Sequence, residues 1–176
     1  MKKQILWIGG GILTLLIAGT MTALHIKNII NLLPKSLTKR YGKRKLSVVK
    51  YIVIHHSAID GFNAFDYAKW HLKRGWAGIG YHYVIEKDGT IQQTNELTTI
   101  SYHVKGYNTK SIGISMSGNF QKHKPTNAQV KSLVALIKKI KKEVNPKLLV
   151  KGHRELNKSL CPGKFVNLSK IRELTA

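Results

Sequence analysis

Acidic residues are scarce in this sequence: 8 aspartates and glutamates stand against 30 lysines and arginines, a formal net charge of +22. The first acidic residue is Asp60, so every charged residue before it is basic. A field of this sign attracts polyanions, and nucleic acid, anionic lipid headgroups and anionic wall polymers all qualify. The charge balance therefore predicts an anionic partner without selecting one.

Cysteine and proline are also rare. The chain has 1 cysteine, Cys161, which excludes an internal disulfide and leaves a thiol that is buried and inert, reactive, or bound to a ligand. A content of 4 prolines and 43% hydrophobic residues excludes a disordered or low-complexity chain. A length of 176 residues accommodates one ordinary domain and a tail, so we expect a single packed core.

Charged residues are absent from residues 5–24. A helix of that length reaches about 30 Å, the thickness of the hydrocarbon core of a bilayer. We therefore predict one N-terminal transmembrane helix within residues 1–26, with Lys2 and Lys3 retained in the cytoplasm and the rest of the chain outside. The alternative is a cleaved signal peptide and a secreted protein, although residues 21–23 fit a small-x-small cleavage site poorly.

Residues 27–46 are predicted to form a basic linker. From Pro34 to Lys45 the sequence is polar and cationic and has no apolar periodicity. Such a stretch either adheres to anionic headgroups or wall polymers or serves only as a solvated tether. A position outside the cytoplasm argues against nucleic acid, so we predict no specific nucleic-acid binding.

Residues 47–176 are predicted to form the folded domain. Helices are expected over residues 64–74 and 127–144, the second from an apolar stripe that includes Leu133 and Ile140. The segments with strand character are residues 48–54, 81–86, 90–93, 111–116 and 147–151. Strands that alternate with helices predict an α/β fold with a mixed central β-sheet flanked by helices.

Three side chains of this domain offer the donor set of a zinc hydrolase, which needs three protein ligands and one open position. His55 ends a predicted strand, and His153 and Cys161 share the loop after another strand. Cys161 is followed by Pro162 and Gly163, which indicate a turn rather than a helix start, where thiolate nucleophiles are often activated. Metal ligation therefore explains the thiol better than nucleophilic catalysis, and a cysteine peptidase using Cys161 with His153 is the competing interpretation.

Several short motifs follow one another along the domain. They are Ile52-Val53-Ile54-His55-His56-Ser57, Trp70-His71, Gly80-Tyr81-His82, His103-Val104-Lys105-Gly106-Tyr107-Asn108, Ser111-Ile112-Gly113-Ile114, and Gly152-His153-Arg154-Glu155 with Cys161-Pro162-Gly163. Their order resembles the zinc-dependent N-acetylmuramoyl-L-alanine amidase family, which includes phage lysozyme-amidases and animal peptidoglycan recognition proteins. The resemblance covers about residues 48–168 in one collinear order.

The resemblance implies a peptidoglycan hydrolase with the amidase and peptidoglycan-recognition fold. It assigns Zn²⁺ to His55, His153 and Cys161. It places Tyr81 beside the metal, where a hydroxyl orients water or donates a hydrogen bond to the developing oxyanion. Water activated by the metal is then expected to cleave the amide between N-acetylmuramic acid and L-alanine.

Four further residues receive roles only from the resemblance. His103 and Asn108 match positions that line the muropeptide groove, and Arg154 either contacts the stem peptide or braces its loop. Ser159 stands where phage-like relatives carry lysine and recognition-like relatives carry threonine, and its hydroxyl is expected to help Tyr81 stabilise the oxyanion. The missing charge puts the rate in question more than the reaction. The alternative function is a non-catalytic muropeptide receptor, and a monomer is expected.

Overall fold

The computed structural model describes residues 24–176. Nearly all of the predicted transmembrane helix, residues 5–24, lies outside this part of the chain. Among residues 24–176, no helix combines the length and the apolar character that a membrane crossing requires. The anchor therefore stays a prediction from sequence.

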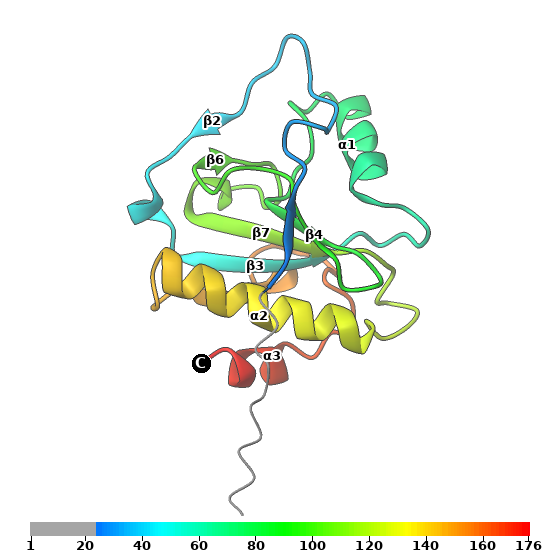
Figure 1. Ribbon diagram of the computed structural model, residues 1–176, viewed down its shortest axis with the longest axis vertical. Coiled ribbons are helices and arrows are strands. Elements are labelled where there is room, and N and C mark those ends of the chain that lie inside the picture. Colours follow the sequence, from blue (N-terminus) through cyan, green and yellow to red (C-terminus); the bar gives the residue numbers. More distant parts are fainter. Residues whose placement is uncertain (1–23) are drawn as a thin grey trace, which may run out of the picture.

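A six-stranded mixed sheet forms the centre of the fold, in the order β1-β5-β4-β7-β3-β8 (Figure 1). β3 pairs in parallel with β7 and β8, β4 is parallel to β7, and β5 returns antiparallel to β4. This arrangement confirms the predicted mixed α/β sheet. The strands are β1 (Ile26–Asn28), β3 (Tyr51–His56), β4 (Tyr83–Ile85), β5 (Ile91–Gln93), β7 (Ser111–Met116) and β8 (Leu149–Gly152), and β2 (Gly42–Lys43) pairs with β6 (Thr99–Ile100) in a separate sheet.

Side chains alternate between the two faces of the central strand β7. Ile112, Ile114 and Met116 belong to the main hydrophobic core and are completely buried. Because successive strand residues point to opposite faces, Gly113 and Ser115 lie on the other face. Small residues there leave room for larger side chains to approach the sheet, and the candidate site uses that room.

Helices cover both faces of the sheet (Figure 1). α2 (Asn127–Glu143) and α3 (Leu168–Leu174) pack on the strands in the main core, whereas α1 (Ala64–Lys73) packs in a second cluster with Val84 of β4. Asn63 and Thr126 close capping boxes at the starts of α1 and α2, which supports the predicted helix boundaries. α3 was not predicted, because a helix this short shows no clear apolar period.

The structure corrects the prediction that residues 27–46 form a linker. β1 adds a strand beside β5, and Ile29 and Leu33 are buried in the cluster that contains α1. Arg44 is only 8% exposed, and its guanidinium donates to four backbone carbonyl oxygens within residues 97–111. This cationic stretch packs against the domain because Ile29 and Leu33, four positions apart, bury their side chains, and because the guanidinium of Arg44 has hydrogen-bond acceptors there.

Candidate metal centre

Strands β3 and β8 bring two of the predicted ligands together. Parallel strands end at the same edge of a sheet, and the register pairs Ile54 with Gly152. The residues that follow are His55 and His153, and their ring centroids lie 4.8 Å apart. Cys161 reaches the same point from the loop after β8. The convergence predicted for these three side chains is therefore present.

One pair of the three donor atoms has the separation that tetrahedral zinc requires. One atom each from His55, His153 and Cys161 lies within 4.8 Å of the other two. The His55 Nδ1 atom is 3.6 Å from the Cys161 Sγ atom. Tetrahedral zinc with bonds of about 2.0 Å to nitrogen and 2.3 Å to sulfur separates such atoms by about 3.5 Å. Two imidazoles and one thiolate also leave a fourth coordination position open.

Protonation of the three ligands favours a metal over a nucleophilic thiol. Burial, with smaller contributions from neighbouring histidines, lowers the pKa of His55 well below its usual value, and burial also lowers that of His153. Neutral imidazoles are the form that binds metals. Burial raises the pKa of the Cys161 thiol to about 12, so without a cation this thiol stays protonated at neutral pH. That state disfavours a cysteine peptidase, whereas a bound cation stabilises the thiolate.

The Cys161 loop is held by hydrogen bonds that involve two predicted site residues. The Cys161 backbone N–H donates to Ser159 Oγ, and the Arg154 backbone N–H donates to the Cys161 carbonyl. The Arg154 guanidinium donates to the Gly163 carbonyl at 2.9 Å. The backbone N–H of His56 donates to Cys161 Sγ at 3.4 Å. Arg154 therefore braces this loop, one of its two predicted roles, and a contact with substrate stays a prediction.

Tyr81 lies beside the ligands, in the segment that leads into β4. Its ring centroid is 5.3 Å from that of His55. Burial, followed by the nearby Cys161 thiol, raises the pKa of the Tyr81 phenol above its ordinary value. Its hydroxyl therefore keeps its proton at neutral pH and can act as a hydrogen-bond donor.

His103 lies next to the ligand His55, and Asn108 supports the loop that carries it, while the predicted lining of a muropeptide groove by these two residues stays a prediction. His103 is 7% exposed, and its Nδ1 atom is 3.0 Å from Nε2 of His55. Asn108 Oδ1 accepts from the backbone N–H groups of His103 and Val104, so this side chain holds the loop that carries His103. The alternation in β7 was the available signal, because a strand with small residues on one face leaves space for a side chain there.

Replacing Gly113 by alanine tests this close packing. An added Cβ would lie 2.6 Å from Cγ of His103, and a buried ring has little space to retreat. We expect the free energy of unfolding to fall by about 1–3 kcal/mol in chemical denaturation, as for other overpacked cores. Gly42→Ala is the matched control, because its nearest neighbour is the flexible end of Ile100 at 3.2 Å. Equal stability of both variants would contradict the packing described.

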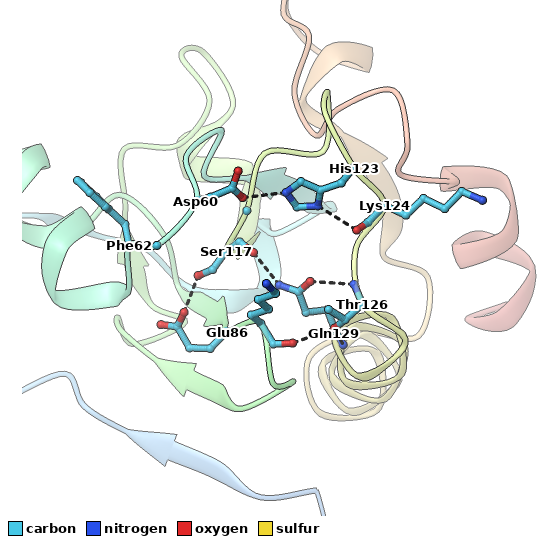
Figure 2. A pocket seen from close by; sticks show the side chains of 11 residues that line it. Asp60, Phe62, Glu86, Ser117, His123, Lys124, Thr126 and Gln129 are labelled. Carbon is cyan, nitrogen blue, oxygen red and sulfur yellow. Dashed lines mark hydrogen bonds and ion pairs between the residues drawn. The ribbon is translucent and has the colours of Figure 1, made fainter.

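A hollow of about 420 Å³ lies elsewhere, beyond the carboxyl ends of β4 and β7 (Figure 2). Several of its polar side chains have partners within the protein. Glu86 accepts a hydrogen bond from Ser117, Gln129 donates to the Ser117 carbonyl, and Asp60 pairs with His123 at 2.8 Å. The residues that line it include none of the predicted site residues. The hollow is therefore separate from the candidate metal centre.

Comparison with known proteins agrees with this geometry. The family described as N-acetylmuramoyl-L-alanine amidase matches residues 44–164. The endolysin of Klebsiella phage KP32 is 32% identical over 99 residues, covering 53% of this chain and 65% of that protein. Peptidoglycan-recognition protein SC2 of Drosophila simulans is 30% identical over 128 residues, covering 66% of this chain and 70% of that protein. The solved Ph2119 endolysin from Thermus scotoductus MAT2119 bacteriophage Ph2119 has a TM-score of 0.74 at 28% identity, over 86% of this chain and 99% of that one.

The family match extends over more than half of the chain and contains His55, His153 and Cys161. The match to the phage KP32 endolysin spans just under two thirds of that protein. The sheet order, the three convergent donors and the family match all lead to the same assignment. The chain belongs to the N-acetylmuramoyl-L-alanine amidase family.

Proposed function

We propose that this protein is a zinc-dependent amidase of peptidoglycan. Its reaction is hydrolysis of the amide between the lactyl group of N-acetylmuramic acid and the L-alanine of the stem peptide. The observation that carries the proposal is the convergence of His55, His153 and Cys161 at one sheet edge beside Tyr81. The endolysin and amidase names of similar proteins support the same reaction.

The residues around the metal position have separate tasks in this reaction. His55, His153 and Cys161 would hold a zinc ion, which when bound would supply an acidified water and polarise a carbonyl group. The Tyr81 hydroxyl, protonated at neutral pH, donates a hydrogen bond to the oxyanion that develops on the scissile carbonyl. The Ser159 oxygen accepts from the Cys161 N–H, which leaves its own proton for the same oxyanion. Arg154 is exposed, so its guanidinium can also meet a carboxylate of the stem peptide.

A non-catalytic muropeptide receptor is the competing function, since recognition proteins are also among the similar proteins. Such a receptor needs a groove but no metal ligands. Here three donors of suitable chemistry converge, one pair of them at the separation that tetrahedral zinc requires, and a protonated phenol lies beside them. These features support hydrolysis over recognition alone.

Digestion of purified sacculi tests the proposal. We expect mass spectrometry to show glycan with intact N-acetylmuramic acid and stem peptides that begin with a free L-alanine amine. EDTA should abolish their release, and added zinc should restore it, because the three ligands are the only source of metal-dependent chemistry proposed. Binding to sacculi without product would favour the receptor. Cleavage that survives complete demetallation would overturn the zinc-dependent reaction.

A further inference from the structure

A chain of buried hydrogen bonds leads from His55 into the interior of the sheet. It passes from His55 to His103, then to Ser111 at the start of β7, and ends at the backbone carbonyl of Tyr107. His55, His103 and Ser111 are each at most 7% exposed. Because water is largely excluded, these groups depend on one another for hydrogen bonds, and the protons can be placed from the end of the chain inward.

The last acceptor of the chain, the Tyr107 carbonyl, determines where the hydroxyl proton of Ser111 points. The Tyr107 carbonyl oxygen can only accept, and Ser111 Oγ lies 2.7 Å from it, so the hydroxyl proton of Ser111 points there. Ser111 Oγ then offers lone pairs to Nε2 of His103 at 3.2 Å. The Ser111 carbonyl, 3.4 Å from the same nitrogen, is also an acceptor. His103 therefore carries its proton on Nε2.

The proton on His103 Nε2 determines the state of His55. His103 is buried, and the partners of its ring nitrogens are an imidazole, a hydroxyl and a carbonyl rather than a carboxylate, so with its proton on Nε2 the ring has a lone pair on Nδ1. Nε2 of His55, 3.0 Å away, must then be the donor in that bond. A neutral His55 ring with its proton on Nε2 keeps a lone pair on Nδ1. That atom faces the Cys161 sulfur across the metal position.

The surrounding structure prevents His103 from turning away. Its ring lies against Gly113, where even a methyl group would come within 2.6 Å of Cγ. The ring of His82 packs edge-on with a centroid distance of 5.8 Å. Asn108 binds the backbone N–H of His103 at 2.9 Å. The acceptor for His55 is therefore held in place before any metal binds.

We propose that His103 and Ser111 are positioning residues that set the tautomer and the orientation of His55, so that Nδ1 presents its lone pair to the metal. The inference rests on the proposed function for the presence of a metal. The donor and acceptor assigned to each hydrogen bond, however, do not depend on a bound metal. Partners that orient a metal-binding histidine commonly affect metal affinity by about 10- to 100-fold.

Two measurements on the full chain test this proposal. Zinc affinity by chelator competition is expected to fall about 10- to 100-fold in His103→Ala. His103→Gln should recover most of the loss, because a glutamine oxygen accepts from His55 while its amide group donates to Ser111. In Ser111→Ala the zinc affinity should fall by about 3- to 10-fold, which is the effect of losing one hydrogen bond. His71→Gln, a buried histidine on α1 that stacks on Trp76, is the control and should bind zinc like the wild type.

The second measurement is ¹⁵N NMR of the imidazole nitrogens in the metal-free protein. We expect a protonated Nε2 and an unprotonated Nδ1 on His55 in the wild type, and a mixture of tautomers in Ser111→Ala and His103→Ala. Wild-type zinc affinity in both variants, or a wild-type His55 with its proton on Nδ1, overturns the proposal. If the wild type binds no zinc, the proposed function fails, while the NMR result still decides the tautomer. Ser111→Ala keeps the test valid if His103→Ala does not fold.

Discussion

Replacing Cys161 with alanine is expected to lower the rate of stem-peptide release from sacculi by at least about 10³-fold, because only two ligands remain to hold the metal that acidifies water. Zinc affinity should fall by more than about 100-fold, beyond the usual effect of residues that only orient a ligand. The thiol is the donor that approaches His55 Nδ1 to 3.6 Å, so its loss opens the site on that side. Release assays and chelator competition on the same preparation measure both effects.

Leu160→Ala is the matched control for this variant. Leu160 is adjacent to Cys161 in the same loop, but its side chain is 75% exposed. We expect wild-type release and wild-type zinc affinity from it. If Cys161→Ala binds zinc and cleaves sacculi at the wild-type rate, the thiol is not a ligand, and the family resemblance has assigned it wrongly. Thermal unfolding of both variants separates loss of metal from loss of fold.

Tyr81→Phe is expected to lower the turnover rate by about 10²- to 10³-fold, as for other enzymes that lose one oxyanion donor. The hydroxyl is available as a donor because burial raises its pKa above the ordinary value, and the Tyr81 ring lies beside that of His55. Zinc affinity should be unchanged, since the phenol oxygen is not among the three metal donors. The combination of slow turnover with normal metal content distinguishes this residue from a ligand.

Tyr51→Phe is the control, because it removes a phenol hydroxyl far from the metal position, at the end of β3 opposite His55. Tyr51 begins β3 and lies about 13 Å from His55 along it, given a rise of about 3.3 Å per residue. Its turnover should match the wild type. A Tyr81→Phe enzyme with the wild-type turnover rate would remove the phenol from the reaction. Loss of zinc in that variant would show instead that Tyr81 supports the metal site.

Much of the site could be predicted because its signals are local. His55 was placed at a strand end by the β-branched run before it, and β3 includes it as expected. His153 and Cys161 were grouped because one loop carries both. Parallel pairing of β3 with β8 then brings the ends of both strands to one edge. Sheet geometry thus explains why three residues separated in sequence meet at a metal position.

Other features depended on contacts that sequence patterns do not contain. The basic composition of residues 27–46 predicted a tether, but Ile29 and Leu33 find an apolar surface and Arg44 finds carbonyl oxygens only after the distant strands have assembled. His103 was assigned to a groove because its motif matches the family there. The direction of its ring follows from the space above Gly113.

The residue beside the proposed metal centre, Tyr81, was assigned by the family resemblance. The sequence by itself determined the main strand segments, the two longer helices and the proposed donor set of that centre. Those features depend on side-chain chemistry and on periodicity within single segments. Only the tertiary structure decided that residues 26–46 belong to the folded part and that His103 and Ser111 stand behind His55. A hydrogen bond between residues 48 positions apart depends on how strands pair and what their small residues leave open, which no local pattern specifies.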